Sequence, residues 1–221
     1  MLYVLRVSLP DIPGSLGAAA TALSAAGANI VSLRVIDRDG RHAFDEICVE
    51  AESVLPEDIR NAIESAPGVV VETIRRTSRI PDPLGALTLA DRLARGEGPP
   101  MDVFVGGLPE ALSASWAMVL EAKDRGLVVG SSTPDAPAPG VLEAPWLPLI
   151  GARRIEMTDR MPPGWRLHRY ELAAAPLDEP ERFVLVGRPT GMRFIGSELR
   201  QLELTADMTD RAQMRAVGNP V

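Results

Sequence analysis

The sequence predicts an α+β protein in two parts, each built on an antiparallel sheet. Apolar side chains alternate over residues 3–9, as Tyr3, Leu5, Val7 and Leu9, which is the pattern of a half-buried strand. Strand and helix patterns then follow one another in the order βαββαβ up to about residue 74. Beyond the break Ile80-Pro81-Asp82-Pro83, a hairpin, two more strands and a terminal helix predict a second α+β domain.

The elements of the first part are separated by clear turn signals. The first helix carries Leu16, Ala19, Ala20 and Leu23 at helical spacing, and Ala26-Gly27-Ala28-Asn29 ends it. The remaining elements are strands at 30–36 and 44–51, a helix at 56–66 and a strand at 69–74. Two similar halves of this kind place four strands in one sheet, with both helices on the same face. The other face and the edge strands stay open, so we expect a homodimer or higher homo-oligomer.

The turn between the first strand and the first helix favours the binding of an anion. Pro13 presets the dihedral of a first helical residue, and Gly14 has no side chain to keep a ligand away from the backbone. Free NH groups at the start of a helix attract a carboxylate or phosphate. We therefore expect the NH groups of residues 14–17 to be unpaired.

Two motifs in this part resemble a known family. Asp11-Ile12-Pro13-Gly14-Ser15-Leu16 matches a D-x-P-G-x-L turn, and Gly27-Ala28-Asn29-Ile30 opens the second strand. On these residues, positions 1–78 resemble an ACT domain with a ferredoxin-like βαββαβ fold. The resemblance implies a free amino acid or similar small effector, bound where the first turn of one domain meets the second strand of a paired domain. The implied ligand-binding residues are Asp11, Ile12, Pro13, Gly14, Ser15, Leu16, Asn29 and Ile30.

A plainer interpretation of the same residues stays open. Asp11 would only cap the helix, Asn29 would only serve the turn that follows it, and no ligand would bind. In the ligand-binding interpretation, helix NH groups take an α-carboxylate while Asp11 or Asn29 accepts hydrogen bonds from an ammonium group.

The second part is predicted to begin at residue 84, after a linker at 79–83, and to run to residue 221. Its expected elements are a helix at 84–95, strands at 116–122, 127–132, 165–173 and 182–188, and a helix at 197–214. Five prolines between Pro134 and Pro148 predict a long loop. On residues 172–177, 183–189 and 194–206, this part resembles a GAF-like sensory domain. Trp116, Trp146 and Trp165 are interpreted as core anchors.

Charge and cysteine content exclude several classes of protein. The net charge of -7 and the absence of a basic run argue against a nucleic-acid partner. Cys48 is the only cysteine, so the chain can form neither an internal disulfide nor a cysteine metal cluster. The stretch 12–33 is uncharged but too rich in Gly, Pro and Ser to span a membrane, and no signal peptide is apparent. We expect a cytoplasmic protein with no membrane partner.

The sequence offers little material for catalysis. His42 and His168 are interpreted as structural, and Cys48 as a buried apolar residue. Glu46, Glu50 and Glu52 alternate on one strand, which is typical of a solvated face or of an interface with arginine partners. We therefore expect no catalytic residues, no metal and no cofactor.

The leading hypothesis is a non-enzymatic sensor that passes the binding signal to the GAF-like domain or to a protein partner. The alternatives are an oligomerisation module without a ligand, and an enzyme of unfamiliar type that uses carboxylates near the proline-rich loop.

Overall fold

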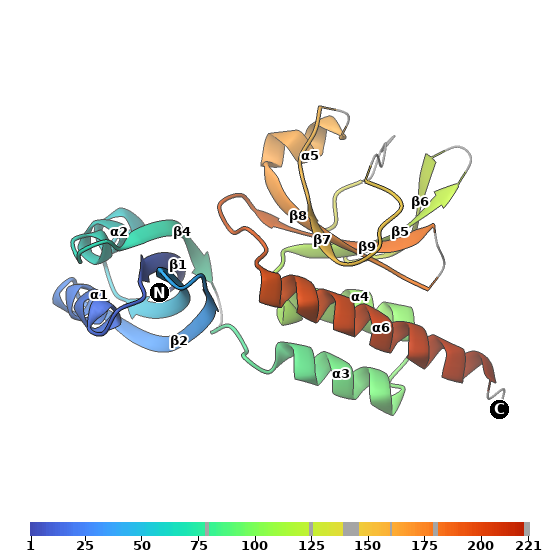
Figure 1. Cartoon of the computed structure of the whole chain (residues 1–221), viewed down its shortest axis with the longest axis horizontal. Helices are drawn as coiled ribbons and strands as arrows, with labels where there is room; N and C mark the ends of the chain where they lie inside the picture. The colour runs from blue at the N-terminus through green and yellow to red at the C-terminus, as the bar shows by residue number, and fades with distance from the viewer. Residues whose placement is uncertain (78–79, 124–125, 139–145, 160, 179–180, 219–221) are drawn as a thin grey trace. The chain divides into compact units, whose positions relative to one another are not determined.

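The chain folds into two compact units, Met1–Pro81 and Asp82–Val221. The computed structural model describes residues 1–77, 80–123, 126–138, 146–159, 161–178 and 181–218 (Figure 1). Each unit contains one antiparallel sheet, of four strands in the first and five in the second. The predicted α+β class with two antiparallel sheets is therefore confirmed.

The N-terminal unit has the predicted βαββαβ order. Its elements are β1 (Leu2–Pro10), α1 (Ser15–Ala25), β2 (Ala28–Arg38), β3 (His42–Ala51), α2 (Pro56–Glu64) and β4 (Val70–Thr77). The strands lie in the order β2-β3-β1-β4, so β2 and β4 form the two edges. A hairpin joins β2 to β3, and β1 pairs with both β3 and β4.

Both helices of this unit cover the same face of the sheet (Figure 1). Tyr3, Leu5, Val7 and Leu9 of β1 are buried there, as their alternation predicts. They pack with Leu23 of α1 and with Ile59 and Ile63 of α2 in one apolar core. The start of α1 is thereby fixed next to the end of β1, which positions the turn between them.

The C-terminal unit places helices on one face of its sheet and a small helix with loops on the other (Figure 1). Its helices are α3 (Gly85–Arg95), α4 (Pro100–Ala111), α5 (Pro163–His168) and α6 (Gly196–Gly218). Its strands are β5 (Trp116–Lys123), β6 (Gly126–Ser132), β7 (Arg153–Ile155), β8 (Tyr170–Pro176) and β9 (Arg182–Pro189). They lie in the order β6-β5-β9-β8-β7, which leaves β6 and β7 at the edges.

Two elements of this unit were not predicted, and one was predicted wrongly. The helix α4 contains Gly106, Gly107 and Pro109, which read as helix breakers in the sequence. The strand β7 is only three residues long and two of them are arginine. Residues 165–168, predicted as strand, belong to α5, so His168 lies at the end of a helix rather than on a strand. Pro162 and Pro163 fit the first turn of that helix, where a missing NH costs nothing.

The three tryptophans are core residues, as predicted from the sequence. Trp116, Trp146 and Trp165 are all buried on the face of the sheet that α5 and the loops cover. The rings of Trp116 and Trp165 lie 5.6 Å apart, and Tyr170 meets Trp116 edge to face at 5.4 Å. Of the predicted proline-rich loop at 134–149, the described residues form no helix or strand, and residues 139–145 lie outside the described chain.

Candidate functional site

The turn between β1 and α1 presents backbone NH groups at the start of a helix. The helix begins at Ser15, two residues after Pro13, so the prediction that Pro13 is the first helical residue was wrong. Gly14 occupies the cap position with φ 96°, a left-handed conformation that favours glycine. The Ser15 NH donates to the Ile12 carbonyl at 3.3 Å. Within the described residues, the NH groups of Gly14, Leu16 and Gly17 meet no acceptor.

Asp11 is held by an arginine that was not among the predicted site residues. Arg38, at the end of β2, donates from Nε to Asp11 Oδ2 at 2.9 Å and from Nη2 to Asp11 Oδ1 at 2.7 Å. This paired hydrogen bond raises the pKa of the Arg38 guanidinium. Asp11 therefore does not cap the helix, which has no side-chain cap. The signal available in the sequence was Arg38 itself, within the charged turn that joins β2 to β3.

Asp45 is a second carboxyl close to this turn. It lies on β3 opposite Val7, on the helix-covered face, and only 1% of its surface is exposed. Its Oδ1 has no hydrogen-bond partner among the described residues. Burial raises the pKa of Asp45, and the nearby charge of Asp11 raises it further. An acidic residue in the apolar alternation of Ala43, Ile47 and Val49 was the sequence signal for it.

Asn29 and Ile30 lie at the other end of β2 from Asp11. Asn29 is exposed and pairs with Glu50, whereas Arg38, the partner of Asp11, pairs with Ala43. Arg38 lies nine positions beyond Asn29 along the strand, a span of roughly 30 Å at 3.3 Å per residue. A single chain therefore holds the predicted site residues in two separate groups. One group consists of Asp11, Ile12, Pro13, Gly14, Ser15 and Leu16, and the other of Asn29 and Ile30.

The other candidate residues of this unit have structural surroundings. Glu46 is buried and lies 3.0 Å from Arg34 and 3.8 Å from Arg6, so it has arginine partners rather than solvent. Cys48 is buried, and burial raises the pKa of its thiol. His42 is exposed, with Nδ1 3.6 Å from Asp39. The described residues include no group of three or more His, Cys, Asp or Glu arranged to hold a metal ion.

Residues 3–67 match the family model of the ACT domain. The N-terminal unit contains an ACT domain. The match covers the turn, α1 and the start of β2, which hold all eight predicted site residues. ACT domains commonly bind small-molecule effectors, and the match suggests a regulatory, ligand-binding role for this unit.

Several solved structures are similar to parts of this ACT-containing chain. The GAF domain of a putative sensor histidine kinase from Pseudomonas syringae pv. tomato is 11% identical, with a TM-score of 0.40 over 60% of this chain and 84% of that one. The GAF domain of the Acinetobacter phosphoenolpyruvate-protein phosphotransferase is 8% identical, with a TM-score of 0.43 over 62% and 95% of the two chains. A formyltetrahydrofolate deformylase from Pseudomonas putida KT2440 is 13% identical, with a TM-score of 0.31 over 44% of this chain and 39% of that one. No curated protein matches the chain.

None of the described helices combines the length and the apolar character needed to cross a membrane.

Proposed function

We propose that the protein is a non-enzymatic regulator whose ACT domain binds a free amino acid. The observation that carries this proposal is the pairing of opposite polarities at one turn. The unpartnered NH groups of Gly14, Leu16 and Gly17 suit an α-carboxylate. The buried carboxyl of Asp45, with an unpartnered oxygen, suits an ammonium group.

A second copy of the chain would complete the site. Asn29 and Ile30 lie too far from the turn to reach the same ligand within one chain. On the edge strand β2, the Val35 side chain is 51% accessible. In the turn, Ile12 is 65% accessible. Apolar side chains on an unpaired edge favour burial against another chain. In the proposed homodimer, the turn of one protomer meets the start of β2 of the other.

The ligand would act by shifting the population of domain arrangements. A ligand that bridges two protomers stabilises the paired arrangement only by its difference in affinity for that arrangement. The C-terminal unit or a further protein would then receive the signal.

One observation favours a purely structural role for the same residues. Both oxygens of Asp11 accept a hydrogen bond from Arg38, so Asp11 already has a structural partner within its own chain. In this alternative, the ACT domain only drives oligomerisation and its interface holds no ligand.

Isothermal titration calorimetry of the full chain against each of the twenty amino acids separates these functions. We expect one amino acid or a small group of them to release heat. Asn29→Ala should weaken that binding about tenfold, because loss of one hydrogen bond to a charged group costs about 1.5 kcal/mol. Asn61→Ala is the matched control, because Asn61 is also exposed but lies on α2. Silence from all twenty amino acids would leave the oligomerisation role.

A further inference from the structure

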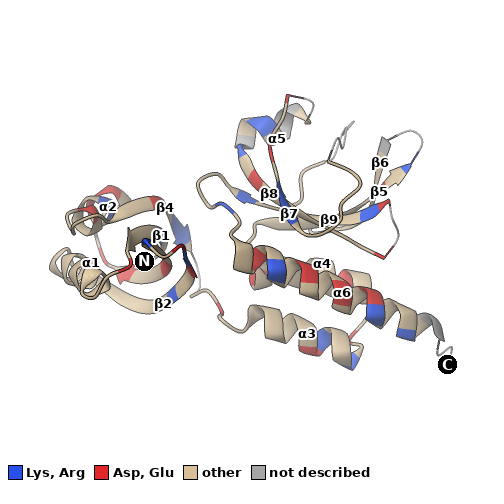
Figure 2. Ribbon diagram, viewed as in Figure 1, with Lys and Arg blue, Asp and Glu red and all other residues tan. Residues whose placement is uncertain are grey.

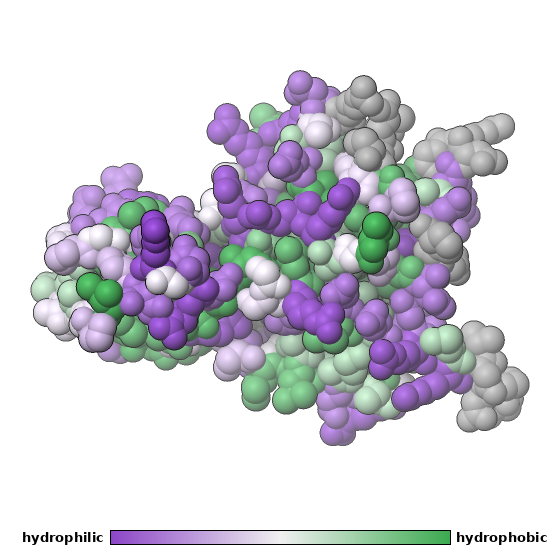
Figure 3. Space-filling model, in the orientation of Figure 1, coloured by the Kyte–Doolittle hydropathy of each residue, from purple (hydrophilic) through white to green (hydrophobic). Residues whose placement is uncertain are grey.

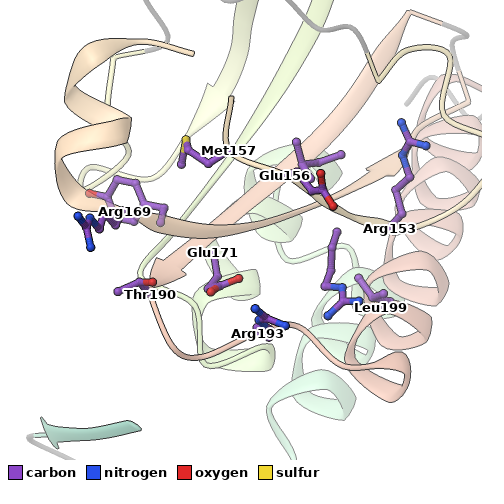
Figure 4. A pocket seen from close by; sticks show the side chains of 11 residues that line it. Arg153, Glu156, Met157, Arg169, Glu171, Thr190, Arg193 and Leu199 are labelled. Atoms are coloured by element: carbon purple, nitrogen blue, oxygen red, sulfur yellow. The ribbon is translucent and has the colours of Figure 1, made fainter. Parts of the chain in front are cut away.

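The C-terminal unit contains a pocket of about 690 Å³ at the free edge of its sheet. The pocket is formed by β7 and the two residues after it, the start of β8, the loop after β9 and the first turn of α6 (Figure 4). It borders the tryptophan cluster beneath α5 and shares Ile155, Met157 and Tyr170 with that cluster. It also lies in a different unit from the ACT domain, so it does not depend on the function proposed above.

The pocket concentrates positive charge in a protein of net charge -7. Its lining holds four arginines, Arg153, Arg154, Arg169 and Arg193, against Glu156 and Glu171. Basic residues mark β7 and the start of β8 (Figure 2), and the surface over β7 is hydrophilic (Figure 3). An excess of guanidinium groups in a hollow attracts anions.

Two of these arginines have side chains that are available to a ligand. Arg154 and Arg169 are exposed, and neither side chain has an ion pair or hydrogen bond with any described residue. Arg153, at the opposite side of the pocket from Arg169, instead donates to the Trp146 carbonyl at 2.7 Å (Figure 4). Arg169 has φ 46°, an uncommon conformation for a residue with a side chain, directly before β8.

A buried ion pair fixes the loop between β9 and α6, which carries Arg193. Arg188 and Glu198 are both buried, with Arg188 Nη1 2.8 Å from Glu198 Oε1. Arg188 also donates to the carbonyls of Met192 and Arg193, which fixes the backbone of the loop at these two residues. Glu171 of β8 accepts a hydrogen bond from the Gly191 NH in the same loop, at 3.4 Å. The pocket is therefore preformed, which lowers the entropic cost of binding.

The remaining lining is partly apolar. Met157, Tyr170 and Leu199 are half-buried on the pocket wall, and Ile155 of β7 is buried beneath it. A ligand that uses both kinds of surface has an anionic group at one end and an apolar body at the other.

We propose that this pocket binds a small organic molecule that carries a carboxylate or phosphate group. Arg154 and Arg169 attract the anionic group, and either guanidinium can form paired hydrogen bonds with a carboxylate or a phosphate. The apolar body lies against Met157, Tyr170 and Leu199. Glu156 and Glu171 accept hydrogen bonds from hydroxyl or amino substituents of the ligand.

Calorimetry with the full chain tests the proposal, with phenyl phosphate, phenylacetate and inorganic phosphate as probes. The first two share an apolar ring and differ in the anionic group, so they identify which oxyanion is preferred. Inorganic phosphate measures the contribution of the anionic group alone. We expect at least one ring-bearing probe to bind at millimolar concentration or below, and more tightly than inorganic phosphate.

Paired variants locate the binding. The double variant Arg154→Gln with Arg169→Gln should lower by at least tenfold the affinity for the probe that binds. Arg211→Gln with Arg215→Gln removes the same charge from α6, roughly 18 Å or more along the helix from Leu199 at 1.5 Å per residue, and should leave affinity unchanged. Circular dichroism melts of both double variants confirm that the fold is intact, as expected for exposed side chains. Absence of binding by all three probes would overturn the proposal, as would an equal loss of affinity in the two double variants.

Discussion

At the scale of single residues, backbone conformation decides which glycines matter in the candidate turn. Gly14 and Gly17 lie three positions apart, and an added methyl group at either would meet no atom within 4 Å. They differ in that Gly14 has φ 96°, whereas Gly17 is helical. The D-x-P-G-x-L pattern therefore specifies the first glycine through its dihedral angles rather than through lack of space.

This difference predicts stability changes of opposite sign. Gly14→Ala should lower the free energy of unfolding by about 1–2 kcal/mol, the cost of a left-handed conformation for a residue with a Cβ atom. Gly17→Ala should raise it by about 0.5 kcal/mol, because alanine loses less entropy than glycine in a helix. Urea denaturation of both variants measures the two effects. Destabilisation by both substitutions would show that the turn is constrained by packing instead.

At the scale of elements, α6 carries two partly or fully buried carboxyl groups with opposite effects on stability. At its start, Glu198 accepts the Ile195 NH at 3.0 Å and pairs with Arg188 of β9. Further along the helix, the carboxyl of Asp210 is desolvated near Asp178, Asp207 and Arg182. The first contact satisfies both partners, whereas the second leaves a carboxyl in surroundings that disfavour its charge.

Glu198→Gln should destabilise the C-terminal unit by about 3–5 kcal/mol, because it leaves the buried Arg188 guanidinium without its counter-charge. Glu203→Gln on the same helix is the control. Glu203 pairs with Arg200 at the surface, and loss of such a pair costs at most about 1 kcal/mol. Thermal or urea unfolding compares the two variants. Similar small losses in both would mean that the Arg188 charge is compensated by other contacts.

Because of Asp210, we expect the free energy of unfolding to fall as the pH rises from about 4 to about 6. Burial, with repulsion from Asp178 and Asp207, raises the pKa of Asp210 to about 6, whereas the unfolded value is near 3.8. The folded state thus binds more protons in this window, and its stabilising contribution is lost as the pH passes the folded pKa.

Asp210→Asn removes this titration, so its free energy of unfolding should decline less between pH 4 and pH 7 than that of the natural chain. Urea titrations at several pH values measure the slope. Asp135→Asn, which removes an exposed carboxyl from a loop, should keep the original slope. An unchanged slope in Asp210→Asn would assign the pH dependence to other groups.

At the scale of the whole molecule, the proposed site extends beyond one chain. The turn and the start of β2 are separated along the strand, so the function depends on how two protomers pair. The two edges of the ACT sheet expose comparable apolar residues, Val35 on β2 and Val70 on β4, which are 51% and 56% accessible.

Sedimentation velocity of matched edge variants tests the pairing. Val35→Lys should shift the proposed dimer toward monomer, because a charge would have to be buried at the β2 edge. Val70→Lys places the same charge on the opposite edge and should leave the dimer intact. A monomeric natural chain at micromolar concentration would contradict the two-chain site, and dissociation only by Val70→Lys would move the interface to β4.

Local sequence patterns were sufficient for the elements whose signal lies in neighbouring residues. Alternation in β1 and the turn residues around Gly14, Gly40 and Gly68 give the βαββαβ order, because strand period and turn chemistry are local properties. They were insufficient for α4, where Gly107 reads as a breaker. A Cβ atom there would lie 2.6 Å from Leu89 Cδ1, so this glycine permits the close contact of α4 with α3. That reason exists only once the two helices are packed.

The sequence alone determined the fold class, the ACT turn and the burial of the tryptophans and Cys48. Each of these follows from residue spacing or from the cost of exposing apolar surface. Only the tertiary structure decided that Asp11 pairs with Arg38, that Asp45 is buried near it, and that arginines from β7, the α5–β8 turn and the β9–α6 loop meet in one pocket. These contacts join residues far apart in the chain, and electrostatic interactions depend on distance in space rather than on separation in sequence.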